Sequence, residues 1–223
     1  MAAHEIIRNV SFHGIGTPGP EREPGEHDYW VRRDLFLRVL DECGGQADVR
    51  LSFDDGNASD AEIALPALVE RGLTADFFPV AGRLGTPGNL DTAGVRELVA
   101  AGMGVGTHGS LHRRWTEVSP RELAEELEVA RTTIAEAAGR TVEYAACPFG
   151  AYDRRVLRRL RVLGYRTVFT SDRRPARDGQ WLQARYSVRA DDTPATFRTT
   201  VFTPRGVGRQ LRDSGVGTVK AWR

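Results

Sequence analysis

Two short strings in this chain hold side chains that could build a catalytic metal site. The first, Leu51-Ser52-Phe53-Asp54-Asp55-Gly56, ends an apolar run with two carboxylates and a glycine. The second, Thr107-His108-Gly109-Ser110-Leu111-His112, places two histidines four positions apart. One carboxylate and two imidazoles on a divalent ion would leave coordination positions open for water and substrate, which is typical of catalytic rather than structural metals. Together the two strings predict a one-metal hydrolase site.

Taken singly, each string also has a simpler interpretation. Asp-Asp-Gly is an ordinary turn sequence, and neighbouring side chains on a regular strand face opposite sides, so Asp54 and Asp55 can share a site only where the strand already turns. Gly56 lowers the free-energy cost of such a turn, because glycine adopts backbone angles that other residues avoid. Residues four apart share a helix face, so the histidine pair could lie on a surface helix. A shared site is favoured because three of the five histidines lie at predicted strand ends.

Short apolar runs alternate with amphipathic stretches along the chain, which is typical of strand–helix units in a parallel sheet. The predicted strands are Ile6–Phe12, Val49–Phe53, Ala75–Val80, Gly104–Thr107, Val142–Cys147, Arg166–Thr170 and Ala184–Val188. The predicted helices are Tyr29–Asp41, Ala58–Arg71, Thr92–Ala101, Pro120–Ala138 and Arg154–Leu163. This pattern favours an α/β fold, a distorted (β/α) barrel with about seven parallel strands, whose strand ends would gather the candidate side chains. The long Pro/Gly loop Gly14–Gly25 is expected to form a rim or lid.

Composition limits the classes of protein to consider. With 223 residues, 40% of them hydrophobic, the chain can bury one core, and we expect a single catalytic domain over residues 1–223. The net charge of +1 predicts no nucleic-acid partner and no anionic membrane surface. Cys43 and Cys147 are too few for a disulfide framework. The sequence shows neither a membrane span nor a charged-then-apolar signal, so we expect a cytoplasmic protein without a transmembrane segment. Nothing in the sequence indicates an oligomeric state.

The motifs as a set resemble those of the polysaccharide deacetylases of the NodB-homology class, also called carbohydrate esterase family four. The resemblance extends from about Val10 to Val188 and rests on motifs that are specific in combination. The first string is similar to the family's first motif, which implies that Asp54 is the catalytic base and Asp55 a metal ligand. The second string is similar to the family's second motif, which implies that the two histidines complete the metal triad.

A third motif extends the resemblance to the substrate groove. Cys147-Pro148-Phe149-Gly150 matches the back half of the family's third motif, which implies that Pro148, Phe149 and Gly150 line the groove. Tyr152 flanks this motif and is expected, with Phe149, to bind the apolar face of a sugar ring. Trp115 and Trp181 could also stack on sugars, although core or surface packing explains them equally well.

One departure from the family pattern concerns the partner of the catalytic base. The third motif usually begins with an arginine that pairs with the base, and Ala146 stands at that position here. Arg185 and Arg189, on or beside a predicted strand near the end of the domain, are the candidates to replace it, because a guanidinium holds a carboxylate in bidentate geometry and is never deprotonated. We favour Arg185.

A second departure concerns the general acid. The family's general-acid histidine normally sits on a C-terminal strand, yet no histidine follows His112. Val10-Ser11-Phe12-His13-Gly14 resembles a strand-then-His segment that some members carry at the N-terminus. A circular permutation of that strand would place His13 where the acid belongs. The alternative for His13 is a capping or core histidine at a strand end.

The resemblance implies a complete hydrolytic mechanism. A divalent ion on Asp55, His108 and His112 would supply hydroxide and polarise an acetyl carbonyl; zinc is expected, and cobalt, nickel or manganese also suits a nitrogen–oxygen site. Asp54 would take a proton from water and His13 would donate one to the departing amine. An acetylated sugar or glycan is the expected substrate.

We therefore predict a metal-dependent carbohydrate deacetylase that removes N-acetyl groups from an amino sugar or glycan precursor, in envelope or exopolysaccharide synthesis. Two alternatives share the fold, an O-acetyl esterase and a formamido-sugar deformylase. An alternative of another class is a carbohydrate-binding pseudoenzyme, which the alanine at the family's arginine position would favour.

Overall fold

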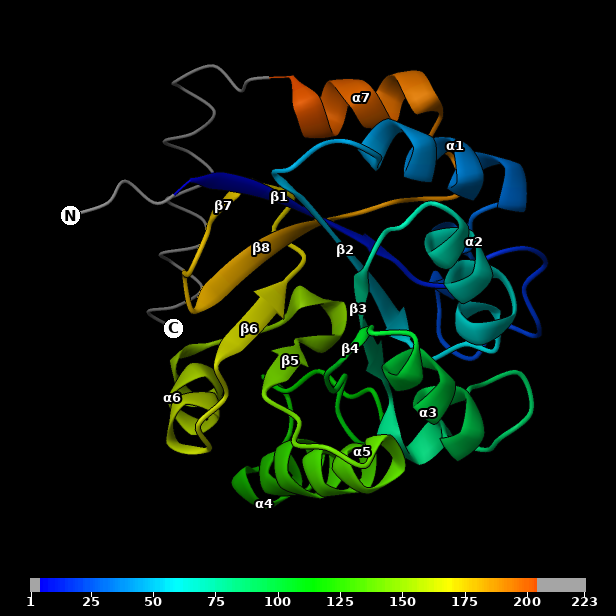
Figure 1. Cartoon of the computed structure of the whole chain (residues 1–223). Coiled ribbons are helices and arrows are strands. Elements are labelled where there is room, and N and C mark those ends of the chain that lie inside the picture. Colours follow the sequence, from blue (N-terminus) through cyan, green and yellow to red (C-terminus); the bar gives the residue numbers. More distant parts are fainter. Residues whose placement is uncertain (1–4, 204–223) are drawn as a thin grey trace.

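Seven parallel strands form a nearly closed barrel in the computed structural model, which describes residues 5–203 (Figure 1). The strand order is β4-β3-β2-β1-β8-β6-β5, and a short strand, β7, pairs antiparallel with β1. The strands are β1 (Ile6–Phe12), β2 (Val49–Asp55), β3 (Ala75–Pro79), β4 (Gly104–Val105), β5 (Tyr144–Ala146), β6 (Thr167–Thr170), β7 (Ala176–Arg177) and β8 (Leu182–Ser187). The predicted distorted barrel of parallel strands is confirmed.

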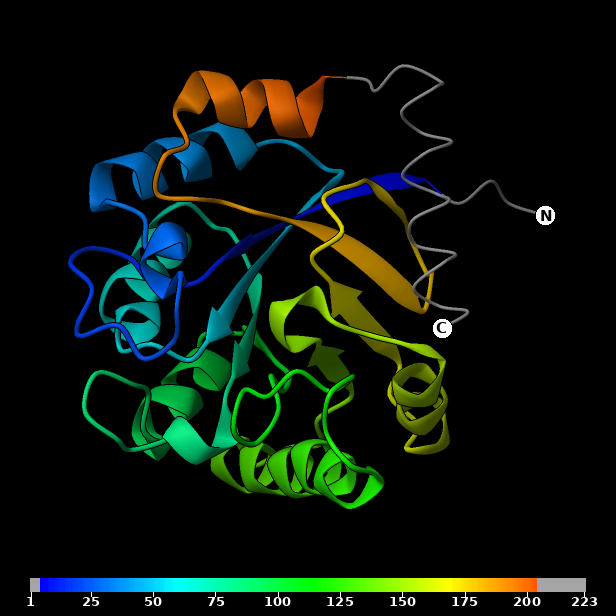
Figure 2. The same cartoon turned by 180° about the vertical axis from the view of Figure 1, so that it is seen from behind.

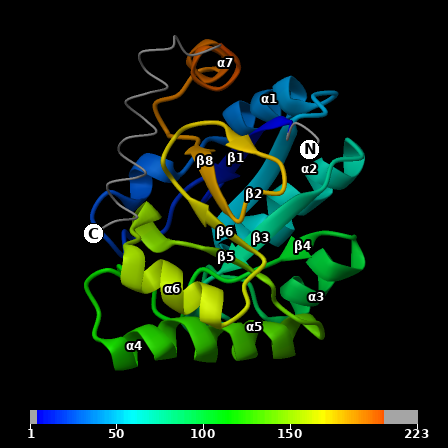
Figure 3. The ribbon, with the colours of Figure 1, turned by 90° about the vertical axis from the view of Figure 1, so that its left-hand side faces the viewer.

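Helices surround the barrel on its outside (Figures 1 and 2). The α-helices are α1 (Arg33–Cys43), α2 (Leu65–Glu70), α3 (Thr92–Ala100), α4 (Pro120–Ala124), α5 (Ala130–Ala138), α6 (Arg154–Val162) and α7 (Pro194–Phe202). Single π turns precede α2 (Asp60–Ala64) and join α4 to α5 (Glu125–Val129), and 3-10 turns occupy Glu26–Tyr29, Ala81–Arg83 and Pro148–Gly150. Figure 3 shows α1 and α7 on one side of the strands and α4 and α5 on the opposite side. Among residues 5–203 no helix combines the length and apolarity needed to cross a membrane.

Predicted and observed elements differ mainly at their ends. The predicted helix Tyr29–Asp41 begins later, at Arg33, because Glu26–Tyr29 forms a 3-10 turn and the chain is extended at Arg32. The predicted helix Pro120–Ala138 is continuous through its π turn and begins with a capping box, in which Ser119 and Glu122 exchange side chain–backbone hydrogen bonds. Strand β7 and helix α7 were not predicted.

The barrel closes through the segment that follows β4. The N–H groups of Gly106 and His108 donate to carbonyls of β3, at 2.8 and 3.0 Å. On the other side, Thr107 donates to the carbonyl of Tyr144 at 3.0 Å and accepts from the N–H of Ala146 at 2.9 Å. The same short segment therefore joins β3 to β5, and it carries the first histidine of the second motif directly into the barrel end.

Side chains alternate between the two faces of the strands, and the two faces differ in chemistry. Phe12, Phe53 and Phe77 are cross-strand neighbours on β1, β2 and β3 with ring centroids 5.3 and 4.7 Å apart, and Phe36 of α1 packs edge-on against Phe12. The alternate positions are buried polar side chains that bond to one another inside the barrel: Asn9, Ser11, Ser52, Asp54, Gln183, Arg185 and Ser187. The apolar face thus fixes the helices, while the polar face is available for a site.

Gly106 should be intolerant of a side chain because of its place in the closure. A Cβ there would lie 2.4 Å from the Phe78 ring and 2.8 Å from the carbonyl oxygen of Tyr144. We expect Gly106→Ala to lower the free energy of unfolding by about 1–3 kcal/mol, the usual cost of overpacking, as measured by urea denaturation. Gly19→Ala is the matched control, since a Cβ at Gly19 would meet no atom of residues 5–203 within 4 Å. Equal stability of the two variants would contradict the closure described here.

Candidate metal-hydrolase site

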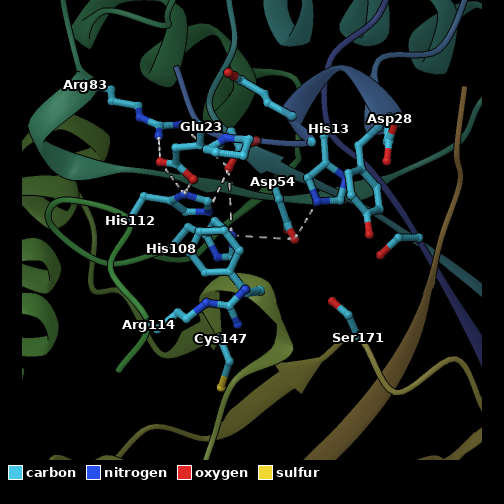
Figure 4. Close-up of a pocket in the computed structure, with 17 residues that line it drawn as sticks. His13, Glu23, Asp28, Asp54, Arg83, His108, His112, Arg114, Cys147 and Ser171 are labelled. Carbon is cyan, nitrogen blue, oxygen red and sulfur yellow. Dashed lines mark hydrogen bonds and ion pairs between the residues drawn. The ribbon is translucent and has the colours of Figure 1, made fainter. Parts of the chain in front are cut away.

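A cavity of about 320 Å³ opens at the carboxyl ends of the strands (Figure 4). Six residues singled out from the sequence line it: His13, Asp54, Asp55, His108, His112 and Phe149. Its other lining residues include Glu23, Asp28, Tyr29, Arg83, Arg114, Cys147, Ser171 and Ser187. The strand ends therefore bring together the two motifs and His13, which are far apart along the chain.

Asp55, His108 and His112 converge with their ligand atoms within 4.8 Å of one another. The Oδ1 atom of Asp55 is 3.3 Å from Nε2 of His112 and 3.8 Å from Nε2 of His108. This Oδ1 atom is buried and has no hydrogen-bond partner in the described part of the chain. A buried carboxylate oxygen without a donor is costly, and a cation between the three side chains would satisfy it. The donor set and its geometry fit a divalent ion.

The backbone at Asp55 explains how two consecutive carboxylates reach one cavity. Strand β2 extends through both aspartates, and Asp55 itself has a φ of 75°, followed by Gly56 with a φ of 73°. A left-handed φ is unfavourable for a residue with a side chain, and such residues gather at functional sites. The turn therefore occurs at Asp55 as well as at the expected glycine, and it brings the second carboxylate alongside the first.

The two histidines do not share a helix, because residues 107–112 form a loop. Its shape depends on the buried side chain of Glu126, whose carboxylate oxygens accept the N–H groups of Ser110 and Leu111, each at 3.0 Å. The loop then bends at His112, which has a φ of 56°. A carboxylate on the helix behind the loop thus positions the second metal-ligand candidate.

His108 is oriented by the backbone of the third motif. Its Nδ1 lies 2.8 Å from the carbonyl oxygen of Ala146, so Nδ1 carries the proton and Nε2 presents a lone pair to the cavity. Burial lowers the pKa of His108 to about 4, against the opposing charge of Asp54. The ring therefore stays neutral, as a metal ligand must be, over a wide range of pH.

Asp54 pairs with Arg185 rather than with an arginine from the third motif. The guanidinium donates from NH1 to Oδ1 at 2.7 Å and from NH2 to Oδ2 at 2.6 Å, and both side chains are essentially inaccessible to solvent. Burial raises the pKa of the Asp54 carboxyl, but the charge and hydrogen bonds of Arg185 outweigh burial, and the pKa lies well below its ordinary value. Arg189 instead contacts Asp28 at the surface, at 3.1 Å.

His13 lies on the opposite side of Asp54 from His108 (Figure 4). Its Nε2 is 4.0 Å from Oδ2 of Asp54, and its ring packs 4.8 Å from that of Tyr29. Its Nδ1 is buried, with no hydrogen-bond partner among the described residues. Strand β1, which ends at Phe12 directly before His13, lies between β2 and β8, the strands that hold Asp54 and Arg185.

The four residues predicted to bind substrate do not behave alike. Phe149 is 44% exposed, lines the cavity and packs 4.6 Å from His112. Pro148 and Gly150 are buried and do not belong to the lining of the described cavity. Tyr152 is also buried and donates its hydroxyl to Asp172 at 2.8 Å, which corrects the expectation that its ring faces a sugar. A left-handed φ of 58° turns Phe149 outward while its neighbours pack inward.

The two tryptophans considered for sugar stacking, Trp115 and Trp181, instead pack within the protein. Trp115 is fully buried, and Trp181 packs against the core and donates its Nε1–H to the carbonyl oxygen of Tyr165 at 2.7 Å. Tyr29, from the 3-10 turn after the long loop, is an aromatic residue of the cavity that sequence reasoning missed. The position of Tyr29 depends on the path of that loop, and hydrophobic periodicity does not predict the path of a loop.

Glu23 and Glu126 are two further residues of the site that the sequence did not single out. Glu23 lies in the loop predicted to form a rim, and its carboxylate is within hydrogen-bond distance of His112 Nδ1. Burial raises the pKa of Glu23, but the hydrogen bond and charge of His112, together with the charge of Arg83, lower the pKa by more than burial raises it. The net shift is downward. Isolated glutamates in a charged sequence carry no distinguishing signal, and contacts alone reveal them.

The parallel barrel thus gathers a carboxylate, two histidines and an arginine-bound second carboxylate at the carboxyl ends of its strands. The profile of the Polysaccharide deacetylase family matches residues 41–168, more than half of the chain. The chain therefore belongs to the polysaccharide deacetylase family. The matched span includes all three motifs, whereas His13 and Arg185 lie outside it.

Individual relatives agree with this assignment. YxkH of Bacillus subtilis (strain 168), named as a polysaccharide deacetylase, is 22% identical over 194 residues, which cover 81% of this chain and 70% of that protein. The deacetylase PplD of Streptococcus pyogenes, solved in complex with acetate, superposes with a TM-score of 0.79 at 19% identity over 90% of this chain and 100% of PplD. A de-N-acetylase of Aggregatibacter actinomycetemcomitans has a TM-score of 0.73 at 15% identity, covering 88% and 100% of the two chains. The structural similarities establish the fold.

Removing Arg185 should be strongly destabilising, because it leaves the Asp54 charge buried and unpaired. We expect Arg185→Met to lower the free energy of unfolding by about 3–5 kcal/mol in urea denaturation. Adding Asp54→Asn should restore part of this loss, since the uncompensated charge is then absent. Arg189→Met is the matched control, with an expected loss of about 0–1 kcal/mol for its surface ion pair. Additive losses in the double variant would argue against coupling between the two side chains.

The depressed pKa of His108 predicts a pH dependence of the metal-free protein. The unfolded chain takes up a proton at His108 near the ordinary pKa of 6.5, whereas the folded protein resists protonation down to about 4. The His108 contribution to stability is therefore complete above that range and is lost as the pH falls through it. The difference in unfolding free energy between wild type and His108→Gln should shrink over this window. A difference that does not change with pH would rule out the buried neutral imidazole.

Proposed function

We propose that this protein is a metal-dependent deacetylase that removes N-acetyl groups from an amino sugar or glycan precursor. The observation that carries the proposal is the convergence of Asp55, His108 and His112 beside the arginine-bound Asp54 in one cavity. Membership of the polysaccharide deacetylase family supports a carbohydrate substrate. The likeness in fold to a protein named as a de-N-acetylase supports the choice of an amide over an ester.

The three converging side chains would hold the ion through Oδ1 of Asp55 and Nε2 of each histidine. Bound there, a divalent ion would lower the pKa of its bound water to about 7 and polarise a carbonyl group. Two nitrogen ligands and one oxygen ligand suit zinc, and they also suit cobalt, nickel or manganese. The cavity beside the triad leaves room for water and for an acetyl group.

Asp54 would act as the base that accepts a proton from the attacking water. Arg185 engages both of its oxygens and keeps the carboxylate ionised at neutral pH, so it is ready to accept. The bidentate contact also fixes the plane of the carboxylate, so the direction of proton transfer is set before substrate arrives. An arginine from β8 thereby does what the family's third-motif arginine does, which weakens the case for a pseudoenzyme based on Ala146.

His13 would donate a proton to the departing amine. Its Nε2 is 4.0 Å from Oδ2 of Asp54, and the ring lies across Asp54 from the two candidate histidine ligands (Figure 4). A proton donor matters for an amide, because the free amide anion is a poor leaving group, and matters less for an ester. The N-terminal position of His13 in the chain is what a circular permutation of its strand would produce. The cytoplasmic site of action and the role in envelope or exopolysaccharide synthesis stay predictions.

The central experiment combines metal analysis with assays of acetate release. Purified protein should contain about one divalent ion per chain and release acetate from N-acetylated amino sugars. Asp55→Ala should lose both metal and turnover, whereas Asp54→Asn should keep the metal and lose turnover, because Asp54 takes no part in coordination. Asp34→Asn, at an exposed position, is the control and should change neither. Wild-type protein that binds no metal under conditions that do not strip it would refute the proposal.

The proposed acid role predicts a substrate-dependent effect at His13. His13→Ala should reduce turnover of an amide by about 10²–10⁴-fold, the usual contribution of a general acid, and reduce turnover of an acetyl ester much less. Metal content should stay unchanged. An equal loss on both substrates would contradict proton donation, and a loss of metal would indicate a supporting role. Faster release from esters than from amides in the wild type would favour the O-acetyl esterase alternative.

A further inference from the structure

The imidazole of His112 lies between two carboxylates. On one side its Nε2 is 3.3 Å from Oδ1 of Asp55. On the other side its Nδ1 is 2.9 Å from Oε1 and 2.7 Å from Oε2 of Glu23 (Figure 4). Since the carboxylate of Glu23 accepts the Nδ1–H, the lone pair of His112 is directed toward Asp55. A histidine ligand held in this way has its tautomer and ring orientation set before the ion arrives.

Arg83 holds Glu23 from a second direction. The guanidinium donates from NH2 to Oε1 of Glu23 at 2.6 Å, while its NH1 is 3.8 Å from Oδ1 of Asp55. Arg83 ends the 3-10 turn that directly follows β3, so it is fixed to the barrel. The Glu23 carboxylate is thereby locked against rotation, and its position relative to His112 does not depend on the long loop alone.

The loop that carries Glu23 is also tied to the residues just after Asp55. Arg22 donates from NH2 to Oδ1 of Asn57 at 2.8 Å and from NH1 to Oδ1 of Asn89 at 2.7 Å. Asn57 is buried and lies two positions beyond Asp55. Adjacent residues of the loop therefore contact the surroundings of both Asp55 and His112. Figure 2 shows the dark-blue loop extending outward beside α2, away from the strands. The hydrogen bonds of Arg22 connect this loop to the site.

We propose that Glu23 is a positioning residue of the metal centre, which sets the affinity for the ion through His112 and couples ion binding to the order of the loop over residues 14–29. The inference rests on the proposed metal site. The negative charge of the Glu23 carboxylate, which accepts the Nδ1–H, raises the basicity of Nε2, and loss of such an outer carboxylate costs metal affinity without removing a ligand. Once the ion fixes His112, the ring holds Glu23 and with it the loop.

Metal affinity tests the first half of this proposal. Metal-free wild type, Glu23→Gln and Glu21→Gln are titrated with Zn²⁺ against a competing chelator, and with Co²⁺ while the visible absorption spectrum is recorded. Glu23→Gln should bind Zn²⁺ about 10–100-fold more weakly and show an altered Co²⁺ spectrum. Glu21→Gln removes the same charge two positions away, where the side chain accepts the N–H of Gly25, and should match wild type. Thermal unfolding of the metal-free variants verifies that both are folded.

Hydrogen exchange tests the second half. Zn²⁺ should slow amide exchange over residues 14–29 in wild type and in Glu21→Gln, and should slow it far less in Glu23→Gln at Zn²⁺ concentrations that saturate each variant. Equal Zn²⁺ affinity and equal exchange in Glu23→Gln and wild type would overturn the role of Glu23 while leaving the metal site intact. A wild type that binds no Zn²⁺ would instead overturn the proposed function, and the inference with it.

Discussion

The buried ion pair between Arg185 and Asp54 is the interaction on which the interior of this barrel depends. A guanidinium enclosed by protein is tolerated only when its charge is paired, and here its two terminal nitrogens make two charge-assisted hydrogen bonds to Asp54 and a third hydrogen bond to Ser52. Phe78 and Phe169 place their rings 5.4 and 5.6 Å from the guanidinium carbon. The pair links β2 to β8 across β1, so the same contact that orients the candidate base also ties together the central strands.

Adjacent aspartates can remain charged in one site because each has a different partner. Asp54 faces Arg185, whereas Asp55 faces the two histidines and the position a cation would occupy. A third carboxyl, that of Asp60, is fully buried without a hydrogen-bond partner among the described residues, and burial together with the two neighbouring aspartates raises its pKa well above the ordinary value. Its neutral form limits the negative charge that the site must accommodate.

Carboxylates outside the candidate metal triad form hydrogen bonds that support the unusual backbone of the site. Glu126 bonds to the amides of the histidine loop, Glu23 bonds to the histidine at its end, and both His112 and Asp55 have left-handed φ values. Such conformations persist only where surrounding contacts over-determine them. The geometry of the candidate metal centre therefore depends on the loops and helices behind it as much as on strand β2, which carries Asp55.

The sequence by itself determined the class of fold and the chemistry of the ligands. Alternating apolar runs placed the strands, because periodicity reflects burial that is local to each element, and the motifs singled out Asp54, Asp55 and both histidines. The capping signal at Thr193-Pro194 would have revealed α7 as well. Only the tertiary structure decided between Arg185 and Arg189 as the partner of Asp54, and showed that Tyr152 is buried and that Glu23 reaches His112. Arg185 and Asp54 are 131 positions apart, and Glu23 and His112 are 89 positions apart. No local sequence pattern encodes contacts over such separations.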